Sequence, residues 1–439
     1  MNKTNYDEQD SRILNTAPTS VYLILTENCN LRCTYCFEKN SRTVQNYMTE
    51  DIAFHSVDII LENTLKKANI FDKKGMPNKI KPASITFFGG EPALCPELMS
   101  KILHYSWDKA AEMGIPIEYG IITNGTLFTD EYEKFLAEWA ELTNGALSVQ
   151  LSIDGIPEIQ NVNRPCALAT QKSSDLVEAT VEKYHKFFSE HNIDPERLTI
   201  HACVSKQSIG KIFDSFKYFY NTLKIINSRF AWVIEDDWDD QDVETLDNEM
   251  AKLIRWLCER TTNQKRFPFK TFDKCSGCSS GKNLFCVDTS GNVFPCHRFF
   301  FFDRLNKELS FGNVLDDNFD INNCDKRDPF TSFDISKISD VCQICIATNY
   351  EYTGSLYERP NHYDAKFMEV LNVWKDVFNE NCEKRYLAQT VVSLNNRVAQ
   401  LEKLLIEKGI IEDSNIKKNC NCNGECKGDS CNCKNKSMY

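Results

Sequence analysis

Short apolar runs alternate with longer amphipathic stretches from Ser20 to Ile234, and this alternation constrains the fold more than any other feature of the chain. It is typical of repeated strand–helix units, in which the strands form a parallel sheet and the helices cover it, so we expect an α/β fold. The apolar runs predict strands at Val21 to Leu25, Ser84 to Phe88, Ile117 to Thr123, Leu147 to Ile153, Leu198 to Val204 and Phe230 to Ile234. The amphipathic stretches predict helices at Asp51 to Leu65, Pro96 to Met113, Asp130 to Glu141, Asp175 to Phe188, Ile209 to Leu223 and Val243 to Arg260.

Three closely spaced cysteines follow the first predicted strand. Cys29, Cys33 and Cys36 are separated by three and two residues, so one tight loop can direct all three thiols at a single small group. Thiolates are the usual ligands of iron–sulfur clusters, and a four-iron cubane held by three of them keeps one iron open for another molecule. The alternatives are three buried thiols or a zinc site, although zinc sites favour paired Cys-x2-Cys units with a fourth Cys or His nearby, which this loop lacks.

The stretch Cys29-Asn-Leu-Arg-Cys33-Thr-Tyr-Cys36, with Tyr35 just before the third cysteine, resembles the signature of the radical S-adenosylmethionine (SAM) enzymes. The resemblance implies an incomplete parallel βα barrel, whose cysteine loop carries a [4Fe-4S] cluster with SAM bound to it. Parallel barrels place their chemistry on the loops that follow the strands, and the cysteine loop occupies such a position.

Polar residues also follow the next three predicted strands. The second strand ends in Phe88-Gly-Gly-Glu-Pro92, where two glycines allow the backbone to approach a ligand closely. This sequence resembles the family's motif for binding the SAM amino group. Further on, Asn124, Ser152 and Asp154 resemble SAM-contacting positions, and Arg164 could meet the SAM carboxylate. The alternatives are ordinary turn residues and a surface arginine. The resemblance thus implies cofactor contacts from Tyr35, Gly89, Gly90, Glu91, Asn124, Ser152, Asp154 and Arg164.

A second cysteine region begins at Cys278. The segment from Asp288 to Gly291 reads as a hairpin turn, which would bring Cys278 and Cys296 onto neighbouring strands, and Cys342-Gln-Ile-Cys345 adds a further pair. The region resembles the opening of the SPASM and twitch extensions, which carry auxiliary clusters beside a radical SAM barrel. The resemblance implies at least one auxiliary [4Fe-4S] cluster held by Cys278, Cys296, Cys342 and Cys345. The full SPASM pattern continues with two more cysteines, but none follows here before Cys382, so one or two auxiliary clusters stay open. The nearby Cys275, Cys286, Cys324 and Cys382 are substitutes or buried thiols.

Two polar features near these regions each allow two interpretations. His297 follows Cys296 in a region that resembles the auxiliary domain of the anaerobic sulfatase maturases, so it could take a proton from a substrate thiol or hydroxyl; alternatively, it orders the cluster loop by hydrogen bonding. The acidic run from Glu235 to Asp242 complements the dipole of the helix that follows, or else forms a docking patch for a basic peptide.

The chain is expected to divide into five parts. These are an N-terminal segment (1–19), the radical SAM partial barrel (20–261), a SPASM/twitch-like domain (262–383), a heptad-like helix (384–410) and a cysteine-rich tail (411–439). The helix carries apolar residues at heptad spacing, which pack on the protein's own surface or form a dimer: Val391, Leu394, Val398, Leu401 and Leu405. The tail holds five cysteines, and its stretch from Asn419 to Lys434 has no large apolar residue, so we expect it to be flexible unless a metal or a partner orders it.

Composition restricts the compartment and the partners. The first twenty residues are polar, and no apolar run approaches membrane-spanning length, so we expect a cytoplasmic protein whose 20 cysteines serve as metal ligands rather than disulfides. The formal net charge of −12 disfavours a general nucleic-acid binder, which would need Lys and Arg to neutralise phosphates.

The resemblance implies an enzyme that cleaves SAM reductively to a 5'-deoxyadenosyl radical. The sequence Pro295-Cys-His-Arg-Phe299, followed by Gly312-Asn-Val, most resembles the corresponding sequences of the maturases of ribosomally made peptides. These enzymes form thioether or carbon crosslinks. The alternatives are formylglycine formation as in the anaerobic sulfatase maturases, dehydrogenation of a small alcohol, or a non-enzymatic thiol-rich metal-binding protein. The expected partners are a cysteine-containing peptide and a reductant such as flavodoxin or ferredoxin. Since the first twenty residues leave no room for a leader-recognition domain, we expect a standalone partner or direct docking.

Overall fold

A computed structural model describes residues 3–36, 46–75, 81–260, 278–300, 309–334, 345–358 and 366–381, with five further residues between 397 and 403. Its contacts divide the chain into two units, Met1–Asp376 and Val377–Tyr439. In the second unit, Val398 and Leu401 of the predicted heptad are 52% and 58% exposed, whereas most of the heptad and the whole cysteine-rich tail lie outside the described residues. None of the helices in the described part is long and apolar enough to cross a membrane.

The first unit is built on one sheet with the strand order β6-β5-β4-β3-β2-β1-β7-β8-β9. Strands β1 to β7 pair in parallel, and β8 and β9 are antiparallel to their neighbours. The strand bounds are β1 (Ser20–Ile24), β2 (Ala83–Phe88), β3 (Ile117–Thr123), β4 (Val149–Ser152), β5 (Leu198–Val204), β6 (Ser228–Trp232), β7 (Leu284–Val287), β8 (Asn292–Phe294) and β9 (Gly312–Asn313).

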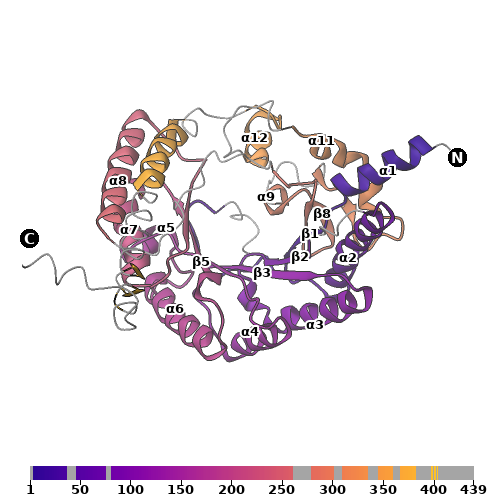
Figure 1. Cartoon of the computed structure of the whole chain (residues 1–439), viewed down its shortest axis with the longest axis horizontal. Helices are drawn as coiled ribbons and strands as arrows, with labels where there is room; N and C mark the ends of the chain where they lie inside the picture. Colours follow the sequence, from indigo (N-terminus) through magenta and orange to yellow (C-terminus); the bar gives the residue numbers. More distant parts are fainter. Residues whose placement is uncertain are drawn as a thin grey trace, which may run out of the picture. The chain divides into compact units, whose positions relative to one another are not determined.

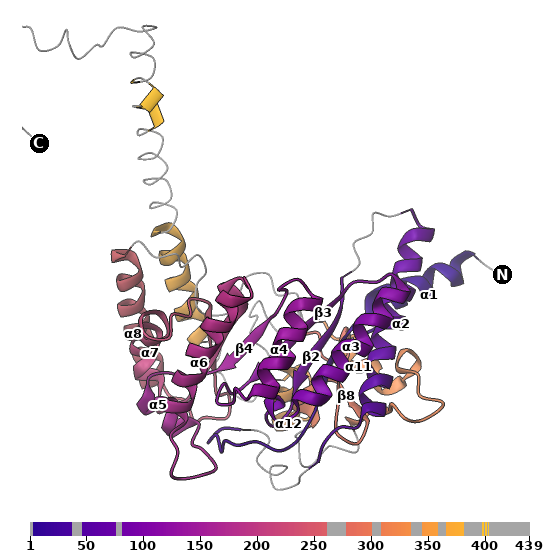
Figure 2. The ribbon, with the colours of Figure 1, turned by 90° about the horizontal axis from the view of Figure 1, so that it is seen from below.

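Helices cover the outside of this sheet. The bounds are α1 (Lys3–Thr16), α2 (Glu50–Lys73), α3 (Pro96–Met113), α4 (Asp130–Leu142), α5 (Pro157–Asn163), α6 (Ser173–Glu190), α7 (Ile212–Asn221), α8 (Asp240–Glu259), α9 (His297–Phe300), α11 (Asp328–Thr331) and α12 (Ile346–Thr353). In Figure 1 the strands form an open arc with the longer helices around it, and α9, α11 and α12 lie at its gap. Figure 2 shows the same arc from below, with α2, α3 and α4 packed side by side outside the sheet.

Strand burial explains how this architecture forms. In β5 every second residue is buried, as Ile200 and Ala202 are, and the residues between them are half-buried. The buried set packs under the helices, as Phe87 of β2 does edge-on against Phe135 of α4, with ring centroids 5.7 Å apart. The half-buried set lies on the other face of the sheet, toward the inside of the arc. A parallel βα sheet curved in this way is the predicted partial barrel.

The six predicted strands are confirmed, with bounds that differ by no more than two residues. The helix predicted from Ile209 to Leu223 begins as a 3-10 turn, Ile209–Lys211, and is α-helical only over Ile212–Asn221. The features that were not predicted from the sequence include α1, the short α5 and the pairing of β7 with β1.

The second cysteine region differs from its prediction in one respect. The hairpin turn from Asp288 to Gly291 is present between β7 and β8, but neither cysteine lies on a strand, so the prediction of neighbouring strands for Cys278 and Cys296 is wrong. Cys278 precedes β7, and β8 ends at Phe294, immediately before Pro295, which has no N–H to continue the ladder. The predicted boundary at residue 261 falls outside the described residues, so the domain division stays a prediction.

Candidate active site

The cysteine loop is held by backbone hydrogen bonds that do not involve its thiols. The segment 163–167, which begins at the last residue of α5, runs beside the loop: Arg32 N donates to Pro165 O at 2.7 Å, and Thr34 N to Asn163 O at 2.9 Å. An antiparallel bridge joins Leu31 to Cys166. The three motif cysteines, Cys29, Cys33 and Cys36, are each half-buried within this frame. The loop therefore presents its sulfurs at the carboxyl end of β1.

Gly89 and Gly90 are required for a reason that the sequence did not show. A Cβ atom on Gly90 would lie 2.2 Å from Asn28 O, and one on Gly89, whose φ is +141°, would lie 2.5 Å from Thr26 O. Gly90 N donates to Thr26 O at 2.7 Å. A close approach to the chain's own backbone at the start of the cysteine loop therefore requires glycine at both positions, and their predicted contact with SAM stays a prediction.

Glu91 ties the ends of β2 and β3 together. Its fully buried carboxylate accepts hydrogen bonds from Thr123 Oγ1 at 2.6 Å, Asn124 N at 2.7 Å and Ala93 N at 3.0 Å. Burial raises the pKa of Glu91, and these three donors oppose the rise. Asn124, fixed in this way, donates through Nδ2 to Asn30 Oδ1 at 2.8 Å and lies 3.8 Å from Cys29 Sγ. The predicted residues Glu91 and Asn124 thus act together on the cysteine loop.

Asp154 is the centre of a second buried cluster. Its carboxylate pairs with Arg164 Nε at 2.9 Å and accepts from Cys203 N at 2.9 Å, from Asn163 Nδ2 at 3.2 Å and from the Tyr35 hydroxyl. The Arg164 side chain is 9% exposed, and its guanidinium lies over the Tyr35 ring. This cluster joins the cysteine loop to the ends of β4 and β5.

The same guanidinium reaches two sulfurs. Arg164 Nη1 lies 4.0 Å from Cys33 Sγ, and Nη2 lies 3.7 Å from Cys203 Sγ. Burial opposes the charge of Arg164, but Asp154, Tyr35 and the two thiols together raise its pKa well above the usual value. Burial and then Asp154 raise the pKa of Cys203 to about 12. Cys203 was not predicted as a site residue; the only signal was its inward-facing position next to the end of β5.

The structure thus brings most of the predicted cofactor-binding residues to one edge of the sheet. Ser152, the last residue of β4, is half-buried there beside the Asp154 cluster. The donor chemistry fits an iron–sulfur cluster, because three thiols share one loop and N–H donors approach the sulfurs of Cys29 and Cys33. Among the described residues, no group of three His, Cys, Asp or Glu side chains forms a ready-made site for a single metal ion.

His297 starts α9 and packs in an aromatic environment. Its ring stacks on Tyr22, with centroids 5.2 Å apart, and lies 4.6 Å from the ring of Phe88. Burial lowers the pKa of His297 to about 4. An imidazole of such low pKa is a weak base at neutral pH, and the ring contacts give His297 a packing role; its hydrogen bonding to the cluster loop stays a prediction. The proton-transfer role stays a prediction.

Two of the predicted auxiliary ligands lie near each other. Burial, followed by the nearby Cys345 thiol, raises the pKa of Cys296 to about 11. Cys278 is half-buried just before β7, and Cys342 lies outside the described residues. Cys286 is fully buried on β7, in register with Tyr22 of β1.

The acidic run before α8 is used within the protein. Asp239 and Asp242 form a capping box at the start of α8, as the helix-dipole interpretation predicts, and Lys206 pairs with both carboxylates, at 2.7 and 3.1 Å. Glu235 pairs with Arg298 of α9. These contacts leave the docking interpretation without support from the described residues.

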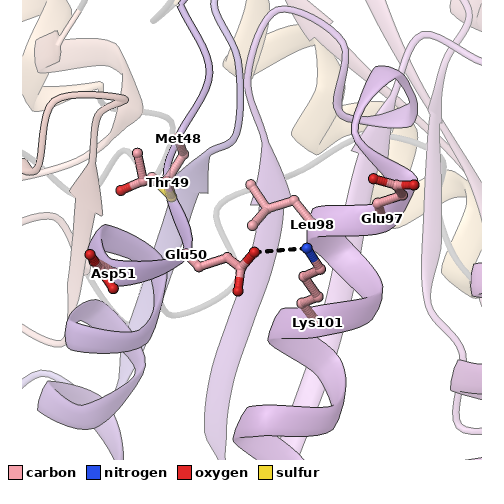
Figure 3. A pocket seen from close by; sticks show the side chains of 7 residues that line it. All are labelled: Met48, Thr49, Glu50, Asp51, Glu97, Leu98 and Lys101. Carbon is pink, nitrogen blue, oxygen red and sulfur yellow. Dashed lines mark hydrogen bonds and ion pairs between the residues drawn. The ribbon is translucent and has the colours of Figure 1, made fainter.

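A surface hollow of about 460 Å³ lies between the first turns of α2 and α3. Figure 3 shows its lining, with Glu50 of α2 paired to Lys101 of α3 at 2.7 Å. The hollow is lined by Met48, Thr49, Glu50, Asp51, Glu97, Leu98 and Lys101. None of the predicted site residues is among them, so the hollow is separate from the candidate active site.

The chain is similar in sequence to radical SAM proteins. The family model of the radical SAM superfamily matches residues 23–194, which include the cysteine loop, Glu91, Asn124, Asp154 and Arg164. A cysteine-type anaerobic sulfatase-maturating enzyme of Clostridium perfringens is 27% identical over 314 residues, which cover 66% of this chain and 76% of that protein. The radical SAM cyclopropyl synthase TigE of Paramaledivibacter caminithermalis is 24% identical over 238 residues, or 50% of this chain and 42% of that protein.

Two solved structures share the fold. Native anSMEcpe with bound AdoMet superposes with a TM-score of 0.61 at 22% identity, over 82% of this chain and 99% of that chain. SuiB of Streptococcus suis bound to S-adenosylmethionine gives a TM-score of 0.54 at 15% identity, over 81% of this chain and 80% of that chain. At these identities the likeness shows a common fold.

Proposed function

Because this chain is a radical SAM enzyme, we propose that it cleaves SAM reductively and uses the resulting radical to modify a cysteine-containing peptide or protein. The observation that carries the proposal is the convergence of the three-cysteine loop with the Glu91–Asn124 and Asp154–Arg164 groups at one edge of the sheet. All of these residues lie in the segment that matches the family. Family membership also excludes the non-enzymatic metal-binding alternative.

The proposal gives the chain's own residues separate tasks. Cys29, Cys33 and Cys36 hold the [4Fe-4S] cluster. When bound, the cluster and SAM supply an electron and a 5'-deoxyadenosyl radical that abstracts hydrogen from the substrate. Asn124 orients the loop at Cys29, and Arg164 orients it at Cys33.

A peptide substrate is supported by the relatives. Solved structures show anSMEcpe with a Cp18Cys peptide, and SuiB with its precursor peptide SuiA. We propose a thioether or carbon crosslink as the product, because the sequence around Cys296 resembles that of peptide maturases. Formylglycine formation is the second candidate, because the chain covers 76% of the sulfatase-maturating relative but only 42% of the cyclopropyl synthase.

We also propose an auxiliary cluster held by Cys278, Cys296, Cys342 and Cys345. The nearness of Cys296 and Cys345 supports it. A cluster with four protein ligands has no open iron, so it would transfer electrons or shape the pocket. Electrons would come from a reductant such as flavodoxin or ferredoxin in the cytoplasm.

The test is anaerobic reconstitution followed by turnover with dithionite. The wild-type protein should produce 5'-deoxyadenosine, and the variant with Cys29, Cys33 and Cys36 changed to Ala should produce none. Cys258→Ala on α8 controls for loss of a thiol elsewhere. Unimpaired SAM cleavage by the triple variant would contradict the proposal.

Mass spectrometry of the peptide then separates the two products. Candidate substrates are short cysteine-containing peptides encoded beside the gene and peptides with a sulfatase-type cysteine motif. A crosslink removes hydrogen and keeps the sulfur, whereas formylglycine formation replaces the thiol by an aldehyde and releases the sulfur as hydrogen sulfide. SAM cleavage without modification of any peptide would contradict the peptide assignment alone.

A further inference from the structure

We propose that Arg164 is a positioning residue that sets the reduction potential of the cluster, by donating a hydrogen bond to the sulfur of Cys33. The inference rests on the proposed function, since it requires Cys33 to be a cluster ligand. It differs from the role implied by the family resemblance, in which Arg164 meets the SAM carboxylate.

The guanidinium is fixed before any ligand arrives. Nε is bonded to Asp154 Oδ1 at 2.9 Å. Asp154 is held in turn by the Tyr35 hydroxyl, by Asn163 Nδ2 and by Cys203 N. Because the guanidinium is planar, fixing Nε against a rigid carboxylate also fixes the directions of the two terminal NH2 groups.

Both terminal groups point at sulfur. Nη1 lies 4.0 Å from Cys33 Sγ, and Nη2 lies 3.7 Å from Cys203 Sγ. Each nitrogen of the fork therefore already has an acceptor within the protein. The Arg164 side chain is only 9% exposed, so little water screens these contacts.

Contact with a cationic donor changes the electronic properties of a thiolate ligand. A hydrogen bond to a ligand sulfur and a nearby positive charge both stabilise the reduced, more negative cluster, which raises its reduction potential. Asp154 balances the overall charge of Arg164 but contacts Nε, whereas Nη1 approaches Cys33. The positive end of the pair therefore faces Cys33.

The test measures the potential in the absence of SAM. The reconstituted full-length chain is titrated with a reductant and followed by EPR, and the relevant signal is identified as the one that SAM addition perturbs. Arg164→Gln should shift its midpoint to a more negative value. The double variant Arg164→Gln with Asp154→Asn should show the same shift, because a neutral amide pair avoids leaving a buried carboxylate without its partner. Arg255→Gln, which removes an exposed arginine on α8, should leave the midpoint unchanged.

The outcomes separate the inference from its premise. An unchanged midpoint together with weakened SAM binding in Arg164→Gln would overturn the inference in favour of the carboxylate role. Loss of the cluster from a folded double variant would also overturn it, because Arg164 would then serve assembly. A wild-type protein without any SAM-responsive cluster signal would overturn the proposed function itself.

Discussion

Replacing Glu91 with glutamine tests whether the end of β2 holds the cysteine loop in place. The buried carboxylate accepts three hydrogen bonds, from Thr123 Oγ1, Ala93 N and Asn124 N. Glutamine has the same shape, but one of its two terminal atoms is an NH2 donor. In either orientation this NH2 group faces a backbone N–H donor. Glu91→Gln therefore breaks at least one hydrogen bond without removing any volume.

The magnitude follows from two opposing effects. Losing a charge-assisted hydrogen bond and leaving a buried N–H without an acceptor costs about 2–4 kcal/mol. Burial raises the pKa of Glu91, which means that the ionised carboxylate is itself costly in the folded protein, and glutamine removes that cost. We therefore expect the free energy of unfolding to fall by about 2 kcal/mol, at the lower end of the range.

Thermal unfolding of the protein without cofactors measures this change. The midpoint for Glu91→Gln should fall by about 3–6 °C. Glu97→Gln, which makes the same chemical change at an exposed site on α3, should stay within about 1 °C of wild type. After reconstitution Glu91→Gln should also retain less iron, because Asn124 loses its anchor. A Glu91→Gln variant with the same unfolding midpoint as the wild type would refute the reasoning, since the three hydrogen bonds would then contribute nothing to stability.

Three further predictions concern other parts of the chain. Gly90→Ala should destabilise the fold by about 2 kcal/mol or more and weaken iron retention, because the new Cβ would lie 2.2 Å from Asn28 O; Gly120→Ala, whose Cβ would meet nothing closer than 3.8 Å, is the control, and equal melting of the two variants would contradict this. Lys67→Met should raise the free energy of unfolding at pH 7 by about 1 kcal/mol, because burial and then the nearby Arg327 and Lys81 lower the pKa of Lys67 to about 8. The charged form of Lys67 destabilises the folded protein fully at pH values below its folded-state pKa, and this destabilisation decreases as the pH rises through about 8. The gain in the free energy of unfolding should therefore be smaller in melts at pH 9. A gain that is independent of pH would contradict the prediction. Changing Cys296 and Cys345 to Ala should lower the iron content from about eight to about four per chain, measured by iron analysis with Mössbauer spectra, whereas an unchanged content would exclude these ligands.

Periodicity and local spacing determined what the sequence could predict. Strands such as Ile117–Thr123 and Leu198–Val204 have clear apolar alternation between polar flanks, so their bounds were predicted well. The three-cysteine loop is also local, since its function depends on spacing within eight residues. Both kinds of signal are contained in one window of sequence, which makes them readable without the fold.

Contacts between distant segments could not be predicted in this way. The approach of Cys203 to Arg164 and Cys33 depends on how β5 lies beside β4, and no local pattern records that register. The glycines after β2 were identified as special, but their close contact proved to be with Thr26 and Asn28 of the chain itself. The glycine pair therefore indicated where the backbone comes close to another group, but the sequence did not show which group that is.

The two cysteine regions are positioned relative to each other by one strand. β1 ends in the cysteine loop and also pairs in parallel with β7, which leads into the hairpin before Cys296. A second link joins the same two regions, because Thr289 in the hairpin turn donates to Glu27 Oε1 at 2.8 Å, two residues before Cys29. Glu27 is only 8% exposed, so this hydrogen bond is shielded from water. A strand ladder and a shielded side-chain contact therefore link the two cysteine regions, as electron transfer between the core cluster and the proposed auxiliary cluster would require.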